Sequence, residues 1–94
     1  MFKIEILSNN EIKMSGRFSA ANVSEAEPIF NQLKSTTKVD FSELDYISSG
    51  GLSVLLKAQK TLKENGGELK LTNMNKMVRE LFHYVGFDTL FTIE

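Results

Sequence analysis

The segment from Asp40 to Leu56 holds the side chains with the clearest potential for chemistry. It reads Asp-Phe-Ser-Glu-Leu-Asp-Tyr-Ile-Ser-Ser-Gly-Gly-Leu-Ser-Val-Leu-Leu, so two serines and two glycines precede apolar residues at helical spacing. Unpaired backbone N–H groups and the positive end of the helix dipole stabilise negative charge at such a helix start. A serine there suits phosphorylation, which adds about −1.5 to −2 charges at pH 7. The added charge would repel an acidic or apolar partner surface and leave the helix intact.

The same residues also have a purely structural interpretation. Serine is a preferred N-cap and glycine a common turn residue, so Ser48 or Ser49 is expected to cap the helix. Gly50 and Gly51 are expected to let a partner approach the backbone closely. Neither G-x-x-x-x-G-K-[ST] nor G-x-G-x-x-G is present, so a nucleotide-binding loop is not supported.

A hydrolytic triad is a weaker interpretation of the polar side chains. Ser48 or Ser49 with His83 and Asp40 supplies the residue types, but no Gly-x-Ser-x-Gly elbow is present. His83 is the single histidine and falls off the apolar stripe of its helix, so we expect it at the surface without a role. No catalytic residue is predicted.

Metal and cofactor sites are not predicted either. Glu43 and Asp45 are two carboxylates without further ligands, which are usually solvated. Met14, Met74 and Met77 are interpreted as core fillers.

Composition indicates one folded domain over residues 1–94. Hydrophobic residues make up 41% of the chain and charged residues 24%, which is typical of globular proteins. Eleven basic and twelve acidic residues leave no footprint for nucleic acid or an anionic membrane. The chain has no cysteine, and the alternating Met1 to Leu7 segment resembles neither a signal peptide nor a membrane span. We expect a soluble, cytoplasmic protein.

The N-terminal residues alternate as in half-buried strands. Phe2, Ile4 and Ile6 predict one strand, and Ile12 and Met14 predict a second. The turn 8–10 between them is short, which requires antiparallel pairing.

Three helices and three further strands follow. A capping box at 24–27 predicts a helix to about Lys34, with Pro28 in its uncertain first turn. Short strands are predicted around 39–41, 69–71 and 91–93. The second helix carries Leu52, Leu55, Leu56, Gln59 and Leu62 on one stripe and ends at Gly66-Gly67. The third begins at Asn73 or Asn75, carries Met74, Val78, Leu81, Phe82 and Val85, and stops at Gly86.

The resulting order is ββαβαβαβ, which predicts an α/β fold. Strand-helix-strand units imply right-handed crossovers onto a mixed sheet. Because the strands alternate, helices should cover mainly one face and leave the other open to solvent.

Four segments resemble the STAS domain family. Asp40 to Leu56 resembles its signature, in which a strand ending in Asp leads to a Ser-Ser/Thr-Gly-Leu helix start. Met14-Ser-Gly-Arg-Phe-Ser-Ala-Ala-Asn22 resembles its Gly-x-Leu-Asp-Ala-Ala segment. Gly66-Gly67-Glu-Leu and the closing residues 85–93 also resemble the family, so the likeness covers essentially the whole chain.

The resemblance implies an anti-sigma factor antagonist, which is a binding protein and not an enzyme. In those antagonists, the serine two places before the Gly-Leu pair is phosphorylated by an anti-sigma factor that is also a serine kinase. That position is Ser49 here, with Ser48 as the alternative. The unphosphorylated antagonist binds the anti-sigma factor and frees the sigma factor, and a PP2C-type phosphatase restores the binding form.

The resemblance also implies a partner-binding patch around the second helix start. Its residues would be Phe18, Ser19, Ala20, Asp40, Ser48, Ser49, Gly50, Gly51, Leu52 and Ser53. Antagonists usually carry Asp where this chain has Ser48 and Ser19. Loss of both acids favours an alternative, a STAS scaffold or sensor subunit that binds another regulatory protein or a small ligand without phosphorylation. An enzyme is the third class.

Overall fold

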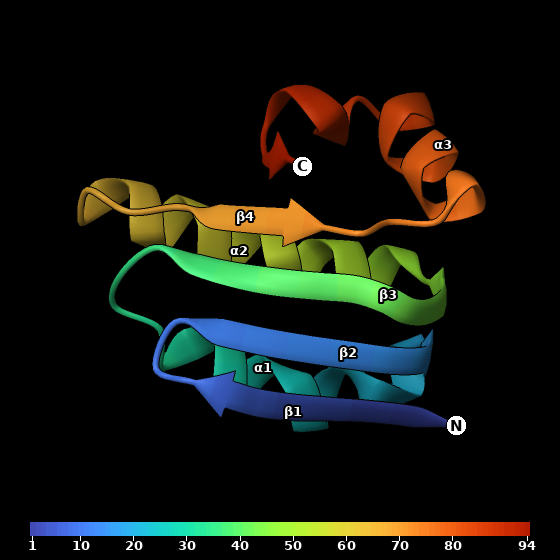
Figure 1. The fold of residues 1–94 in the computed structure, drawn as a ribbon, viewed down its shortest axis with the longest axis horizontal. Helices are drawn as coiled ribbons and strands as arrows, with labels where there is room; N and C mark the ends of the chain where they lie inside the picture. Colours follow the sequence, from blue (N-terminus) through green and yellow to red (C-terminus); the bar gives the residue numbers. More distant parts are fainter.

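The computed structural model describes residues 1–94 and contains the eight predicted elements in the predicted order (Figure 1). The strands are β1 (Phe2–Ser8), β2 (Glu11–Phe18), β3 (Thr37–Ile47), β4 (Leu69–Thr72) and β5 (Thr92–Ile93). The helices are α1 (Val23–Asn31), α2 (Ser49–Glu64) and α3 (Lys76–Tyr84), with short 3-10 turns η1 (Ala20–Asn22) and η2 (Phe87–Thr89). None of the helices is long and apolar enough to cross a membrane.

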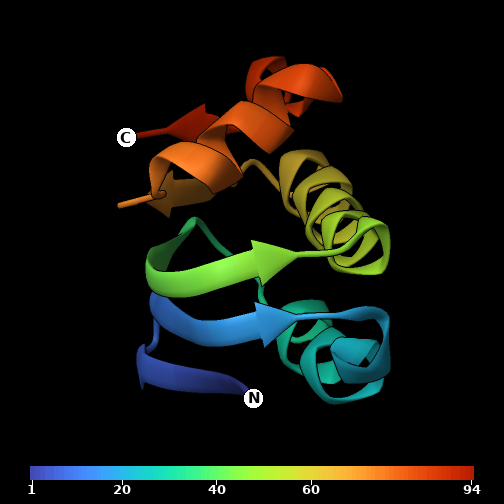
Figure 2. The ribbon, with the colours of Figure 1, turned by 90° about the vertical axis from the view of Figure 1, so that its right-hand side faces the viewer.

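The five strands form one mixed sheet in the order β1-β2-β3-β4-β5. The β1 and β2 strands pair antiparallel, as their short connection predicts, and the remaining neighbours pair parallel. Successive crossovers advance in one direction along the sheet, so right-handed connections place their helices on one face. Figure 2 shows α1 and α2 together on that side. The predicted α/β architecture is therefore confirmed.

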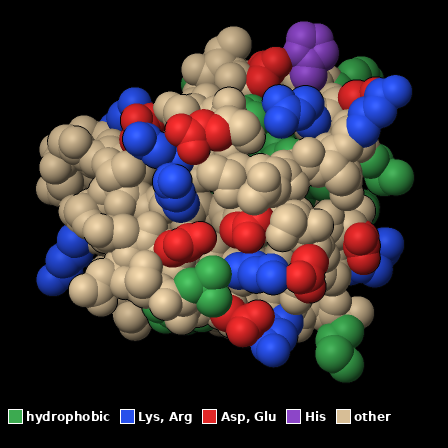
Figure 3. Space-filling view, viewed as in Figure 1, with side chains coloured by type: hydrophobic (Ala, Val, Ile, Leu, Met, Phe, Trp, Pro, Cys, Tyr) green, Lys and Arg blue, Asp and Glu red, His purple; other side chains and the backbone are tan.

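The opposite face of the sheet is polar. Lys, Arg, Asp and Glu side chains of both signs are interspersed over it (Figure 3). Lys13 and Glu43, from neighbouring strands, form an ion pair with 2.7 Å between Nζ and Oε2. The hydrogen bond and charge of Glu43 raise the pKa of Lys13 above its ordinary value.

The core lies between the sheet and its helices. Its largest fully buried side chains include Phe18, Phe30, Phe41 and Phe82. Met14 and Met74 are buried as predicted, but the prediction for Met77 is wrong, because this side chain is 69% exposed on α3.

The β3 strand is longer than the sequence pattern predicts. Where β3 pairs with β2, it has one extra residue opposite the step from Lys13 to Ser15 and another opposite the step from Gly16 to Arg17. The β3 strand therefore contains two bulges. Each bulge changes the apolar spacing from two to three residues. The buried side chains in this part of β3 are Phe41, Leu44 and Ile47. Residues 42–47, which lie outside the short strand predicted around 39–41, are therefore also strand.

The start and end of α1 differ from the prediction. Ser24 lies inside the helix and does not cap it. The turn before α1 is instead fixed by Ser19 and Asn22, whose Oδ1 accepts hydrogen bonds from the Ser19 N–H at 3.1 Å and hydroxyl at 2.9 Å. Pro28 lies in the sixth position of α1, beyond the predicted first turn, and the helix stops at Asn31 rather than Lys34.

The α3 helix begins at the second of its two candidate caps. Asn75 Oδ1 accepts a hydrogen bond of 2.8 Å from the Val78 N–H, while Asn73 has a left-handed φ of 59°. Gly86 adopts the predicted left-handed conformation with φ 78°. Val85 is 41% exposed, because it follows the last turn of α3 and leaves the buried stripe.

Candidate functional site

The start of α2 is fixed by Ser48. Its N–H donates to the Phe18 carbonyl at the end of the neighbouring strand β2, at 2.8 Å. Its Oγ accepts a hydrogen bond of 3.2 Å from the Gly51 N–H, and its backbone is extended with φ −87° and ψ 171°. These are the features of an N-cap, so of the two candidate serines Ser48 caps the helix.

Ser49 occupies the first position of α2 and is exposed. Its side chain stands where backbone N–H groups and the helix dipole favour negative charge. Ser53, one turn later on the same helix, is also exposed. The structure therefore places two hydroxyl side chains at the accessible end of α2.

The two glycines serve internal packing. Gly51 is buried, and a Cβ there would lie 2.8 Å from Ile47 Cγ1 and 3.1 Å from the Phe18 ring. A Cβ on Gly50 would lie 3.1 Å from Val23 Cγ2. The prediction that Gly51 opens the backbone to a partner is therefore wrong, since the chain's own core occupies the space above it.

The turn after β2 lies directly beside the α2 start. A Cβ on Gly50 would be 3.6 Å from the Ala20 Cα. Ala20 is exposed and Ser19 half-buried, so both reach the same surface as Ser49. We define the α2-start surface by its exposed and half-buried residues, which are Ser19, Ala20, Ser48, Ser49, Gly50 and Ser53.

Besides Gly51, two residues of the predicted patch lie underneath this surface. The Phe18 side chain is fully buried and Leu52 is 6% exposed. The expectation that these side chains face a partner is corrected, because both support the α2 start from the core.

Asp40 lies in another part of the molecule. It precedes Ile47 by seven residues of strand, which places it about 20 Å from the end of β3. Partial burial acts to raise its pKa, but hydrogen bonds from the Ser42 N–H at 2.8 Å and the Asn73 amide at 3.2 Å hold the pKa below its usual value. Asp40 joins β3 to the chain after β4, so its expected place beside the helix start is wrong.

An apolar groove between the end of β3 and α3 was not predicted from the sequence. Its volume is about 460 Å³, and it is flanked by Asp45 and Glu80. The hydrophobic residues that line the groove are Tyr46, Ile47, Met77, Val78, Leu81 and Tyr84. Ile47 directly precedes the Ser48 cap, so the groove and the α2-start surface are adjacent.

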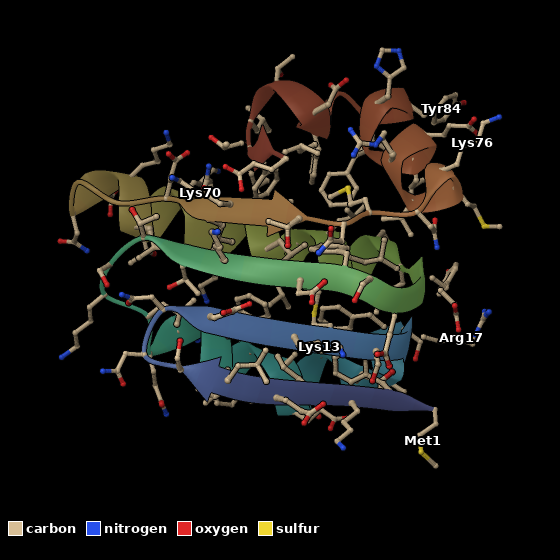
Figure 4. All side chains as sticks on the ribbon, viewed as in Figure 1. Met1, Lys13, Arg17, Lys70, Lys76 and Tyr84 are labelled. Carbon is tan, nitrogen blue, oxygen red and sulfur yellow. The ribbon has the colours of Figure 1, made fainter.

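Side chains around this groove project from one end of the molecule. Arg17, Lys76 and Tyr84 extend there in Figure 4. The Arg17 guanidinium lies 4.4 Å from the centre of the Tyr46 ring, a cation–π distance. Tyr84 is 88% exposed and Met77 69%, and both line this groove, so together they form an exposed apolar patch of the kind that marks interaction sites.

The polar residues considered for a triad have other partners. His83 is exposed, as predicted, and its Nδ1 lies 2.7 Å from Asp88 Oδ2. Asp40 is engaged by Ser42 and Asn73. No group of three or more His, Cys, Asp or Glu side chains is arranged to hold a metal ion.

Comparison with known proteins identifies sequence relatives. A protein-family model described as "Mlab, STAS domain" matches residues 8–92. BtrV of Bordetella bronchiseptica, described as a candidate anti-sigma factor antagonist, is 44% identical over 55 residues. The alignment covers 58% of this chain and 47% of BtrV, so the match spans about half of that relative.

Solved structures share the fold across the chain. A candidate anti-sigma factor antagonist from Thermotoga maritima superposes with a TM-score of 0.80 at 18% identity, covering 99% of this chain and 85% of the other. The anti-sigma factor antagonist SpoIIAA in its unphosphorylated form gives 0.76 at 20% identity, with 100% and 88% covered. The phosphorylated form of SpoIIAA, from Bacillus, gives 0.72 at 17% identity, with 100% and 91% covered.

Proposed function

Because this chain belongs to the STAS domain family, we propose that it is an anti-sigma factor antagonist, a binding protein without catalytic activity. Its partner would be an anti-sigma factor of the serine kinase type, bound in the cytoplasm while Ser49 is unphosphorylated. Phosphate on Ser49 would dissolve the complex, and a PP2C-type phosphatase would restore binding. Binding would thereby control transcription that depends on a sigma factor.

The observation that carries this proposal is that the two neighbouring serines occupy different positions at the start of α2. The Ser48 hydroxyl caps α2 through Gly51, whereas Ser49 is exposed at the first helical position. A phosphate on Ser48 would stand on the oxygen that caps the helix. A phosphate on Ser49 would leave the cap in place, which favours Ser49 as the phosphoacceptor.

The α2-start surface and the apolar groove together form the docking surface of this proposal. The groove supplies exposed apolar side chains, including Met77, which is 69% exposed, and Tyr84, which is 88% exposed. Methionine and aromatic side chains adapt to a partner and are enriched in interface cores. Ser49 lies two residues after Ile47, which lines the groove, so a charge acquired on Ser49 would lie within a contact area that spans both surfaces.

The size of the electrostatic effect is sufficient for a switch. Like charges brought together in an interface cost several kcal/mol, and each 1.4 kcal/mol is about tenfold in affinity. The phosphate adds about −1.5 to −2 charges at pH 7. We therefore expect binding to weaken by at least about a hundredfold on modification.

The test has a modification arm and a binding arm. The protein is incubated with ATP and serine kinases of its own source, and phosphate is mapped by mass spectrometry. Modification is expected on Ser49 and is expected to be absent in Ser49→Ala. Calorimetry with the anti-sigma factor should then show tight binding for the unmodified protein and for Ser49→Ala, and weak binding for Ser49→Asp.

Thr61→Asp is the matched control. It adds the same charge to an exposed position of the same helix, about 18 Å further along its axis. At that distance salt screens the charge, so binding should be unchanged. An unmodified Ser49, with equal binding by Ser49→Asp and the parent protein, would reject the switch.

A STAS subunit that binds another regulatory protein or a small ligand without phosphorylation is the second candidate. Ser48 and Ser19 favour it, because they stand where antagonists usually carry Asp and here make local caps. Ser48→Asp discriminates between the candidates, since aspartate also caps helices well. If the switch is correct, this variant should be phosphorylated on Ser49 at least as fast as the parent protein.

A further inference from the structure

The outer edge of β1 is open for pairing with another strand. β1 is the outermost strand of the sheet, and no element covers its free side (Figure 1). It is seven residues long, whereas β5 at the opposite edge has two. Long exposed edges present unpaired N–H and C=O groups that attract further strands.

The backbone groups that face outward can be assigned from the register with β2. The Arg17 N–H donates to the Met1 carbonyl at 3.1 Å, so these two residues form a hydrogen-bonded pair. Antiparallel pairs alternate, so the backbone groups of Lys3 and Glu5 also face β2. The N–H and C=O groups of Phe2, Ile4 and Ile6 therefore point away from the sheet.

The side chains of β1 carry a self-complementary charge pattern. Lys3 and Glu5 share one face, with 3.8 Å between Nζ and Oε1. Phe2, on the other face, stacks on Phe18 with ring centres 4.7 Å apart. Ile6 and the bulged Leu7 are 62% and 50% exposed, which leaves apolar surface uncovered along the free edge.

We propose that a second copy of this chain pairs antiparallel with β1, with Ile4 opposite Ile4, to form one continuous sheet across a two-fold axis. In this register, outward backbone groups meet outward backbone groups at each hydrogen-bonded pair. Phe2 lies opposite Ile6 of the second copy, which covers the exposed isoleucine. Lys3 lies opposite Glu5 of the second copy, twice by symmetry.

The alternative antiparallel registers are disfavoured by charge. A shift of the axis to residue 3 places Lys3 opposite Lys3, and a shift to residue 5 places Glu5 opposite Glu5. Like charges directly opposite each other destabilise a strand pair, and opposite charges stabilise it. The edge therefore selects one register and a two-fold dimer. The α2-start surface lies on other elements than β1, so it remains available to a partner in this dimer.

Charge reversal tests the register. In Lys3→Glu, the two acidic residues of one β1 strand lie opposite the two acidic residues of the other copy. In Glu5→Lys, two basic residues lie opposite two basic residues in the same way. By sedimentation equilibrium from micromolar to millimolar concentration, each variant alone should dimerise roughly tenfold or more weakly than the parent protein. An equimolar mixture of the two variants should regain dimers, because each strand then faces the opposite charge.

Ile6→Pro tests the backbone pairing. Proline removes an N–H that faces outward, so two hydrogen bonds of the dimer are lost and none of the β1–β2 ladder. Lys38→Glu is the control, because it reverses an exposed charge on β3, away from the edge. Circular dichroism and thermal unfolding verify that each variant is folded.

A parent protein that stays monomeric over the whole concentration range would overturn the proposal. A dimer that Ile6→Pro and both charge reversals leave intact would overturn it equally. Dimers lost in the single variants but not regained on mixing would reject the register with Ile4 on the axis.

Discussion

The cap assignment predicts that the same substitution destabilises the protein at Ser48 and leaves its stability nearly unchanged at the neighbouring Ser49. Ser48→Ala removes the oxygen that accepts the Gly51 N–H, and the loss of an N-cap side chain costs about 0.5–2 kcal/mol. Gly51 is buried, so water replaces the lost partner poorly. We therefore expect Ser48→Ala to lower the free energy of unfolding by about 1–2 kcal/mol.

Ser49→Ala should leave stability nearly unchanged. Ser49 is exposed in the first turn of α2, where alanine fits the helix at least as well as serine, so the change should stay within about 0.5 kcal/mol. For a domain of this size, the loss predicted for Ser48→Ala lowers Tm by roughly 5–10 °C. Urea unfolding followed by circular dichroism measures both values under the same conditions.

Ser48→Asp and Ser48→Gly complete the series. Aspartate keeps a cap oxygen and glycine at this position costs only a few tenths of a kcal/mol, so both should be more stable than Ser48→Ala. The cap assignment is refuted if Ser48→Ala matches the parent protein, or if Ser49→Ala loses as much stability. In the first case Ser48 would have no structural role, and in the second Ser49 would share that role. Either result removes the reason to prefer Ser49 as phosphoacceptor.

Three further outcomes follow from the packing and from the carboxylates. Gly51→Val should lower the free energy of unfolding by roughly 1–3 kcal/mol, because the new valine side chain would clash with Ile47 and Phe18. Urea unfolding measures this loss, and unchanged stability would contradict the close packing. The Thr92 hydroxyl donates to Glu68 at 2.6 Å and is the main cause that lowers the pKa of that carboxyl. Thr92→Val should therefore cost about 1 kcal/mol at neutral pH, and the difference should shrink as the pH falls through the lowered pKa of Glu68. Asp40→Asn should destabilise the folded protein at neutral pH. Because the pKa of Asp40 is lowered in the folded state, this loss of stability should shrink progressively below the ordinary carboxyl range. Thermal unfolding at stepped pH measures it, and a loss that persists in acid would contradict the prediction.

Element order was predictable because local patterns coincide with tertiary contacts in most of this chain. The alternation of Phe2, Ile4 and Ile6 marked β1, and Gly86 marked the end of α3. The course of β3 was not predictable, since its two bulges follow from pairing with β2 and replace the two-residue period. Asp40 was misplaced for the same reason, because seven further strand residues separate it from α2.

The site was predictable where it depends on helix-end chemistry. A serine cap followed by an exposed serine can be identified from Ser-Ser-Gly-Gly before an apolar stretch. The role of Gly51 required knowledge of its tertiary neighbours, which are the Ile47 side chain at the end of β3 and the Phe18 ring at the end of β2. The groove was not predicted because Met77 was interpreted as a core residue and Tyr84 was given no role. Only the position of α3 relative to β3 shows that both side chains are uncovered.

The bond from the Ser48 N–H to the Phe18 carbonyl ties the cap of α2 to the last residue of β2. One amide proton therefore reports on the integrity of both the helix end and the parallel pairing of β2 with β3. In deuterium exchange, that proton should be released only when strand and helix separate, and its exchange rate measures how rigidly the surface is held before a partner arrives.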